Sequence, residues 1–246
     1  KRVAGQRCPA TARKTFVVRN GPDIRWFKPT KPNSALKKGR SYLLGYLGIM
    51  AVQDGVEYIL KAARYLIREK RFEDFIIYLI GAGDDVRRLK RLAKDYALER
   101  EVVFTGRLPD GPTIEILSTA DLCLSPDPFN ALNDSSTMNK VMEYMALGKP
   151  IVSFQLSEAR YSAGDAALYV ANNDERAFAE GIYELLLDGG RRDQMGRYGK
   201  RRLEDKLAWH KQIDNLIEVY RFVGGTPPDR RQKPDGRAPQ TPRRTR

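Results

Sequence analysis

The feature that most constrains the fold is a series of short apolar runs separated by segments of helical periodicity. The clearest run is Phe75–Ile80, which is apolar throughout and therefore typical of a strand buried on both faces of a sheet. Further strands are expected at 15–19, 42–47, 102–104, 121–125, 151–154 and 167–170, and helices at 56–69, from Asp84 onward, and at 114–119, 174–187, 191–203 and 209–223. This alternation predicts an α/β fold, a Rossmann-like three-layer sandwich with a mostly parallel sheet.

Composition narrows the partners that such a chain can have. With 246 residues, 41% of them hydrophobic, the chain can bury a sizeable core. Its net charge of +13 favours anionic partners, which include phosphorylated substrates, lipid headgroups and nucleic acid. Cys8 and Cys123 have no companion at metal-ligand spacing, so we expect no bound metal and a reducing compartment. No apolar run approaches the length of a membrane span, which favours a cytoplasmic protein.

The chain divides into three parts on composition. Residues 1–16 are basic and lack a clear period, and they are expected to form a weakly ordered lead-in. Residues 17–223 carry the strand and helix pattern and are expected to form one domain, in which 158–164 is a loop. Residues 224–246 contain five prolines and seven basic residues, so a disordered basic tail is predicted.

The stretch from Asn133 to Val152 combines structural and chemical signals. Short polar residues at its start can begin a helix, and Gly148 and Pro150 end it. We expect free backbone N–H groups at 135–138, where the positive end of the helix dipole suits a phosphate. At 100° per residue, Lys140 and Glu143 share a polar face, and Glu143 can accept hydrogen bonds from a ribose diol.

The ends of the expected strands place several loops around one crevice. In an open parallel sheet, ligands bind beyond the carboxyl ends of the strands. That edge gathers the loops at 45–48, 81–83, 105–108, 125–129 and 133–138. Gly55 begins a helix near this edge and permits a close approach by ligand oxygens.

Individual side chains also have ordinary structural explanations. Arg107 is a phosphate ligand or a solvated surface residue, and Lys140 contacts phosphate or pairs with Glu143 across a helical turn. Asp127 is favoured as a loop cap over a ligand. Lys149 is expected to neutralise the end of its helix, and His210, the only histidine, is expected to be structural.

The run N-K-V-M-E-Y-M-A-L-G-K-P-I-V from Asn139 resembles the donor-binding helix of retaining GT-B glycosyltransferases of family 4. That family carries two glutamates in this region; the second matches Glu143, whereas Ser135 occupies the position of the first, as in a subgroup with a lysine before the second acid. Two family phosphate ligands are also replaced, by Tyr46 and Asp54. The run V-V-R-N-G-P-D-I-R-W-F-K-P resembles the crossover from the acceptor domain, so the chain is expected to be the donor-binding half of such an enzyme.

The resemblance implies transfer of a sugar with retention from a nucleoside-diphosphate sugar, with UDP or GDP as the nucleotide, to an acceptor hydroxyl in polysaccharide or glycoconjugate biosynthesis. Expected partners are the nucleotide sugar and the missing N-terminal domain, together with peripheral contact with the inner face of the membrane; no cofactor, metal or nucleic acid is expected, and the isolated fragment should be inactive. The expected catalytic residues are Glu143, Lys140 and Arg107. The expected donor-binding residues are Gly48, Gly55, Gly83, Thr105, Arg107, Leu108, Ser135, Ser136, Thr137, Met138 and Glu143.

Two other functions remain open. A nucleotide-sensing module without catalysis is favoured by the replaced phosphate ligands. A nucleic-acid-binding protein is suggested only by the charge, since the basic residues are not interleaved with aromatic platforms.

Overall fold

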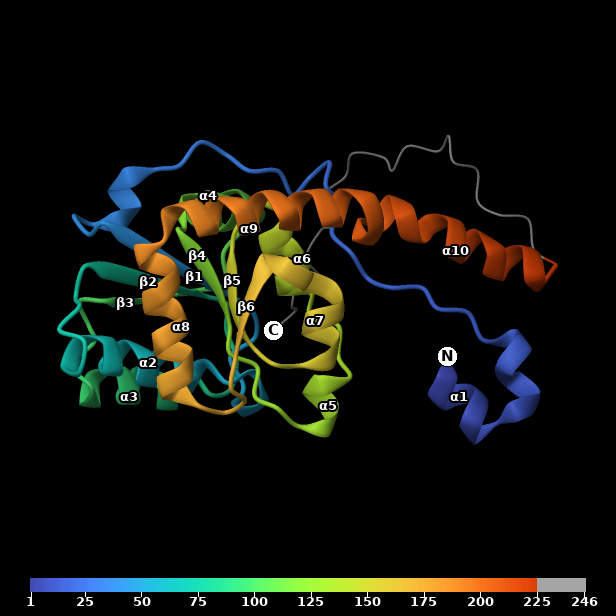
Figure 1. Ribbon diagram of the computed structural model, residues 1–246, viewed down its shortest axis with the longest axis horizontal. Helices are drawn as coiled ribbons and strands as arrows, with labels where there is room; N and C mark the ends of the chain where they lie inside the picture. Colours follow the sequence, from blue (N-terminus) through green and yellow to red (C-terminus); the bar gives the residue numbers. More distant parts are fainter. Residues whose placement is uncertain (225–246) are drawn as a thin grey trace, which may run out of the picture. The chain divides into compact units, whose positions relative to one another are not determined.

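Six parallel strands form the centre of the fold. The computed structural model describes residues 1–224, except the side chains of residues 2 and 3. The strands run in the order β3-β2-β1-β4-β5-β6, and each strand pairs in parallel with its neighbours (Figure 1). The strand order reverses between β1 and β4, which is the position where doubly wound folds bind ligands. The bounds are β1 (Tyr42–Leu47), β2 (Phe75–Ile80), β3 (Val102–Gly106), β4 (Leu122–Ser125), β5 (Ile151–Phe154) and β6 (Ala167–Val170).

Successive residues of each strand point to opposite faces of the sheet and into separate apolar clusters. Leu44, Ile77 and Leu124 pack into one cluster, whereas Leu43 and Ile76 pack into the other. Because both faces are covered, the strands are mainly apolar rather than alternating, with single polar residues such as Ser125 in β4 and Ser153 in β5. The apolar runs therefore predicted the parallel sheet correctly.

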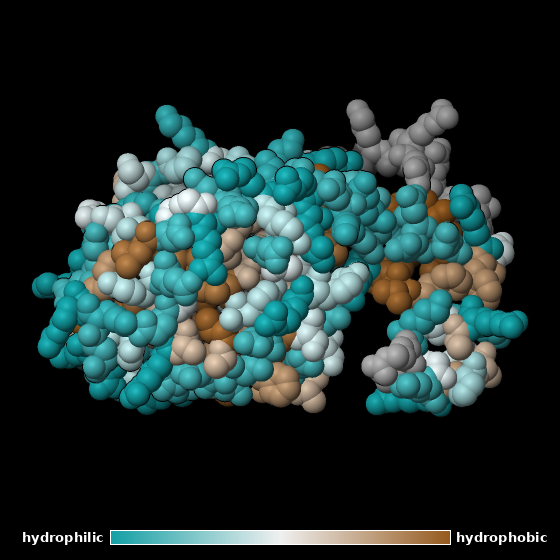
Figure 2. All heavy atoms as spheres, viewed as in Figure 1, coloured by the Kyte–Doolittle hydropathy of each residue, from teal (hydrophilic) through white to brown (hydrophobic). Residues whose placement is uncertain are grey.

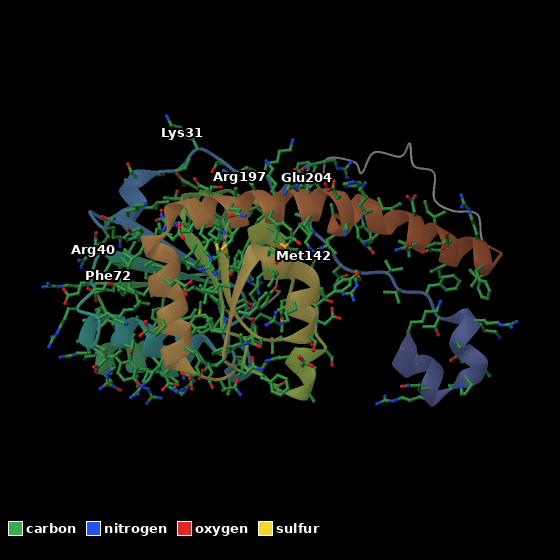
Figure 3. The ribbon with its side chains drawn as sticks, viewed as in Figure 1. Lys31, Arg40, Phe72, Met142, Arg197 and Glu204 are labelled. Carbon is green, nitrogen blue, oxygen red and sulfur yellow. The ribbon has the colours of Figure 1, made fainter. Side chains whose placement is uncertain are left out.

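Helices cover both faces of the sheet (Figure 1). The first cluster contains side chains of α2 (Val56–Arg68), α3 (Val86–Asp95) and α8 (Glu175–Leu187), and the second contains side chains of α4 (Asp110–Thr119) and α6 (Asn139–Ala146). Figure 3 labels Met142, a buried residue of α6. The other helical elements of this region are η2 (Ser34–Lys37), η3 (Val52–Asp54), α5 (Ala131–Asp134), α7 (Ser157–Ala163), η4 (Gly164–Ala166), α9 (Gly189–Arg202) and η5 (Leu203–Leu207).

The chain divides into two compact units. Residues 19–212 form the unit that contains the sheet, and the described residues 1–18 and 213–224 belong to the other. In the smaller unit, the predicted weakly ordered lead-in contains α1 (Arg2–Arg7) and η1 (Pro9–Lys14), and Phe16 packs on Phe222 with ring centroids 5.2 Å apart. Helix α10 (Trp209–Phe222) begins in the larger unit and ends in the smaller one.

Several sequence-based predictions were wrong. Residues 15–19 form no strand, because no neighbouring strand pairs with them. The predicted loop at 158–164 is mostly helix α7, whose buried Ala159 and Ala163 are too small to give a clear apolar period. Helix α5 was not predicted, although the side chain of Asn130 caps it. The predicted disordered tail at 224–246 lies, from residue 225 onward, outside the described part of the chain.

The surface of the larger unit is mainly hydrophilic on the face drawn in Figure 2, with small hydrophobic patches between hydrophilic residues. Within residues 1–224, no helix is both long and apolar enough to cross a bilayer.

Candidate nucleotide site

The point where the strand order reverses brings two loops together. The loop after β1 reaches η3, and the loop after β4 leads to α5 and α6. The side chain of Asn133 joins them, since its amide donates to the carbonyls of Gln53 and Pro128 at 2.9 Å each. The entrance of α6 therefore lies at the carboxyl edge of the sheet, as the crevice prediction required.

Four consecutive backbone N–H groups are free where α6 begins. In the part of the chain that the structure describes, the amides of Thr137, Met138, Asn139 and Lys140 have no hydrogen-bond acceptor, and no side chain caps the helix. The first amide with a partner is that of Val141, which donates to the carbonyl of Met138 at 3.2 Å. Such a row of amides at the positive end of a helix dipole favours an anion.

The two serines before this row do not contribute free amides. The amides of Ser135 and Ser136 donate to the carbonyls of Leu132 and Asn133 at 3.2 and 3.1 Å. Their hydroxyls donate to the carbonyls of Ala131 and Leu132. The prediction of free amides at Ser135 and Ser136 was therefore wrong, because α5 uses these groups to complete its own last turn.

Lys140 and Asp127 form an ion pair in the interior. The ammonium nitrogen of Lys140 lies 2.6 Å from Oδ1 of Asp127, and the two side chains are only 7% and 1% exposed. Ser125 donates to Oδ2 of Asp127 at 2.8 Å, and the Lys140 ammonium lies 5.0 Å from the centre of the Tyr46 ring. Burial lowers the pKa of Lys140, but the charge and hydrogen bond of Asp127, together with Tyr46 and Asp54, outweigh this effect and raise the pKa above its ordinary value.

This pair corrects two predictions. Lys140 does not lie on an exposed polar face with Glu143, because its long side chain turns inward to the loop after β4. Asp127 is not a loop cap, since both of its carboxylate oxygens hold side chains. Lys140 is therefore already neutralised by a protein carboxylate.

Glu143 lies one turn further along α6, and its carboxylate, unlike the Lys140 ammonium, is not paired with another side chain of the described chain. It is half-buried, and among residues 1–224 its carboxylate has neither a hydrogen bond nor an ion pair. Burial raises the pKa of its carboxyl, and the negative charge of Asp110 raises it further, while Lys140 opposes the shift. A partly desolvated carboxylate with no partner can accept hydrogen bonds from a ligand.

The predicted glycines lie close to other parts of the protein rather than to open space. A Cβ atom on Gly55 would lie 2.2 Å from the carbonyl oxygen of Pro126, and one on Gly83 would lie 2.3 Å from that of Met50. A Cβ atom on Gly48 would meet the Tyr46 hydroxyl at 2.9 Å. These glycines allow the loops at the sheet edge to pack together. At Gly55 the space of a side chain is taken by Pro126, which gives this glycine a packing role, and its contact with ligand oxygens stays a prediction.

The loop after β3 supplies one free cation. Arg107 is exposed, and among the described residues it has no ion-pair partner. Thr105 hydrogen-bonds to the carbonyl of Gly106 at 2.8 Å, and Leu108 packs partly into the second apolar cluster. Only Arg107 of these three predicted residues presents an unused polar group.

A hollow lies at the same edge of the sheet, beside the predicted crevice loops at 81–83 and 105–108, but sequence reasoning missed its basic side chains. It has a volume of about 500 Å³, and the exposed side chains of Arg87 and Lys90 line it together with Phe104. Gly81, Gly83 and Gly106 form part of its wall. The signal was available in the pair of glycines after β2 followed by a basic helix.

Other titratable side chains have structural roles. The Lys149 ammonium donates to the carbonyls of Ser118 and Ala120 at 2.5 and 2.8 Å. It therefore caps the end of α4, whereas the sequence predicted that it would neutralise the end of α6. Cys123 is buried, which raises the pKa of its thiol to about 12. His210 is exposed on α10. Residues 1–224 contain no group of three or more His, Cys, Asp and Glu side chains arranged to hold a metal ion.

Comparisons with known proteins relate the chain to glycosyltransferases. A family model described as "Glycosyl transferases group 1" matches residues 41–188. D-inositol 3-phosphate glycosyltransferase of Corynebacterium urealyticum is 26% identical over 86% of this chain and 52% of that protein. A GDP-mannose-dependent mannosyltransferase of Corynebacterium glutamicum, acting on a monoacylated phosphatidylinositol monomannoside, is 25% identical over 81% of this chain and 54% of that protein. The chain thus spans about half the length of these relatives.

Solved structures share the fold. Sucrose-phosphate synthase from Thermosynechococcus elongatus matches with a TM-score of 0.73 and 20% identity, over 91% of this chain and 56% of that one. The C-terminal domain of a group 1 glycosyl transferase, LpcC from Francisella tularensis, matches with a TM-score of 0.63 and 18% identity, over 76% of this chain and 99% of that domain. Anabaena HepE, solved in complex with UDP, matches with a TM-score of 0.67 and 18% identity, over 84% of this chain and 57% of that one. The α/β fold is therefore that of a GT-B glycosyltransferase domain.

Proposed function

Because the chain belongs to the glycosyl transferases group 1 family, we propose that it binds the nucleotide-sugar donor of a retaining glycosyltransferase. In the proposed reaction, the bond between the anomeric carbon and the diphosphate oxygen breaks, and the oxygen of an acceptor hydroxyl bonds to that carbon on the same face of the ring. The proton of the hydroxyl passes to the departing diphosphate. The described unit would hold the nucleoside diphosphate. The acceptor would be bound by a further domain of the same polypeptide, so that residues 1–246 alone would bind donor without appreciable turnover.

The arrangement at the start of α6 carries this proposal. Four free amides are followed within about one turn by a half-buried carboxylate that has no protein partner in the described part of the chain. The amides suit the two phosphates, and the Glu143 carboxylate suits a pair of ribose hydroxyls. Charge on the leaving diphosphate develops in the transition state, where the amides and the Arg107 guanidinium can stabilise it.

Lys140 has a different role in this proposal from the one expected on sequence. Its ammonium is held by Asp127, so it offers the ligand little net charge. We propose that the pair instead fixes α6 against the loop after β4, which keeps the row of free amides in place. Lys140 is thus a positioning residue and not a phosphate ligand.

The absence of two family phosphate ligands supports a second candidate, a nucleotide-sensing module without catalysis. Tyr46 is fully buried and donates to the carbonyl of Ile49, and Asp54 accepts from the amide of Ala51. Neither side chain can replace a phosphate-binding cation. Both candidates require the nucleotide to bind at α6, and only the enzyme transfers sugar when the full-length protein receives donor and acceptor.

Calorimetric titration with UDP and with GDP tests the proposed site. The Glu143→Gln variant should bind the preferred nucleotide at least about tenfold more weakly, since hydrogen bonds to a charged group contribute roughly 1.5–3 kcal/mol. Glu99→Gln is the matched control, because Glu99 is exposed in the turn before β3 and has no partner among residues 1–224. Equal affinity of the wild type and Glu143→Gln would remove Glu143 from the site.

A further inference from the structure

A cluster centred on Arg19 adjoins the row of free amides. The guanidinium of Arg19 makes two hydrogen bonds to the Glu158 carboxylate, at 2.6 and 3.2 Å, and donates to the Thr137 hydroxyl at 3.2 Å. The Thr137 hydroxyl in turn donates to Glu158 at 3.0 Å. Arg19 also lies 4.1 Å from the centre of the Tyr161 ring. The first residue of the amide row is therefore held by a closed network of three side chains.

The charges in this network bear directly on anion binding. Glu158 is hydrogen-bonded to Thr137, whose backbone N–H is free, so its negative charge lies next to the place where a phosphate would bind. An unpaired Glu158 carboxylate would repel a diphosphate, because the two charges would be close together and only partly screened by water. The bidentate contact with Arg19 cancels that charge in a geometry that lysine cannot reproduce.

The network also fixes the direction of Thr137. Its hydroxyl accepts from Arg19 and donates to Glu158, so both partners hold the side chain on one side of the backbone. The hydrogen bond from Arg19 to Glu158 lowers the pKa of Glu158, which keeps this carboxylate charged and paired. The free N–H of Thr137 is thereby left to face other groups.

Arg19 is held at its backbone as well. Its N–H donates to the side-chain oxygen of Gln212 at 3.3 Å, and the N–H of Trp209 donates to the carbonyl of Pro22 at 3.3 Å. Residues 19 and 212 are the two ends of the larger unit. The chain therefore enters and leaves this unit at one place, and the Arg19 side chain connects that place to the start of α6.

We propose that Arg19 is a positioning residue for the diphosphate: it neutralises Glu158 and orients Thr137, so that the amides at the start of α6 meet the phosphates without an opposing charge. This inference rests on the proposed nucleotide site. It adds that the affinity for phosphate depends on Arg19, the first residue of the larger unit.

The test compares UDP, GDP and uridine binding to the full chain carrying Arg19→Ala, Glu158→Gln or both substitutions. Arg19→Ala should weaken binding of the preferred nucleotide by about tenfold, because it exposes the phosphates to an unpaired carboxylate. Adding Glu158→Gln should restore affinity to within about twofold of the Glu158→Gln single variant, since the repelling charge is then gone. Uridine, which has no phosphate, should bind all four proteins alike.

A purely structural role for Arg19 predicts a different pattern. Arg19→Ala would then weaken uridine and UDP together, and Glu158→Gln would not restore binding; this pattern would overturn the proposal. Arg25→Ala is the control, because Arg25 pairs with Asp23 on the surface of the same segment. If Arg19→Ala does not fold, Arg19→Gln removes the charge while keeping hydrogen-bond donors, and the same rescue is expected.

The outcomes also separate this inference from the proposed function. Failure of the wild type to bind either nucleotide would overturn both. Normal binding by the wild type with unchanged affinity in Arg19→Ala would overturn the role of Arg19 alone.

Discussion

Lys140 and Glu143 lie one helical turn apart on α6, and the protein treats their charges in opposite ways. Lys140 is buried against Asp127, with a separation of 2.6 Å. Glu143 is half-buried, and its carboxylate has no hydrogen bond or ion pair within the described chain. The first charge is closed within the protein, and the second is available to a ligand.

The difference shows how burial and pairing together distinguish structural charges from functional ones. A buried charge with a partner stabilises a particular arrangement, although the net energy of the pair can be small. A partly buried charge without a partner lowers stability and is retained when a ligand supplies the missing hydrogen bonds. On this reasoning Lys140 holds α6 in place, and Glu143 binds the ligand.

The largest effect is expected from breaking the closed pair. Lys140→Met should lower the free energy of unfolding by about 3–5 kcal/mol, because it leaves the buried Asp127 carboxylate without a counterion. Urea denaturation measures this change. Lys94→Met is the control, since Lys94 is exposed at the end of α3. The double variant Lys140→Met/Asp127→Leu should regain most of the loss, and a loss below about 1 kcal/mol in the single variant would show that the pair is not closed as described.

A proline at the first position of α6 sharpens the comparison, because it alters the row of free amides and leaves the Lys140–Asp127 pair unchanged. Asn139→Pro removes one free N–H, and proline is favoured at the first position of a helix. The preceding residue, Met138, already has φ −84° and ψ 110°, a conformation that proline tolerates. UDP or GDP affinity should fall by about tenfold or more for the loss of one charge-assisted hydrogen bond, with unfolding unchanged.

The side-chain control for this proline is Asn139→Ala, which keeps the N–H and should bind nucleotide like the wild type. Weakening of equal size in both variants would place the interaction on the Asn139 side chain and not on the backbone.

The smallest effect is a pH dependence of stability that has opposite signs at Glu143 and Glu158. Because burial raises the pKa of Glu143, its contribution to stability is fully present below its unfolded pKa and is lost as pH rises through its folded pKa. Glu143→Gln should therefore gain stability relative to the wild type between acidic and neutral pH, by about 1 kcal/mol or less.

Glu158 provides the opposite case in the same experiment. The hydrogen bond from Arg19 lowers the pKa of Glu158, so its contribution is present above its unfolded pKa and is lost as pH falls through its folded pKa. Glu158→Gln should be less stable than the wild type at neutral pH and equal to it in acid. Thermal unfolding from pH 3 to pH 8 measures both differences, and parallel curves for the two variants would contradict the contrast.

The sheet was predictable from sequence because its signal is local. A strand covered on both faces must be apolar along its whole length, and runs such as Phe75–Ile80 cannot be explained by an exposed strand. The Asp174 cap of α8 was predictable for the same reason, since its side chain binds amides two and three residues later. Residues 15–19 show the limit of this signal, because a short apolar run becomes a strand only when another strand pairs with it.

The site was only partly predictable because its decisive contacts are not local. Helical spacing placed Lys140 beside Glu143, but the carboxylate that pairs with Lys140 lies 13 residues earlier, in the loop after β4. The free amides begin at Thr137 and not Ser135, because the Asn130 cap starts an extra helix whose last turn uses the serine amides. Arg19 is 118 residues from Thr137 in sequence, and no motif links them.

The central claim is that a nucleoside diphosphate binds at the start of α6, and residue-resolved NMR titration tests it most directly. On addition of UDP or GDP to the full chain at millimolar concentration, the amide signals of Thr137, Met138, Asn139 and Lys140 should shift and saturate together. The signals of Ser135 and Ser136 should shift less, because their N–H groups are already bonded. Saturating shifts confined to other parts of the sheet edge, or no shift with either nucleotide, would contradict the account.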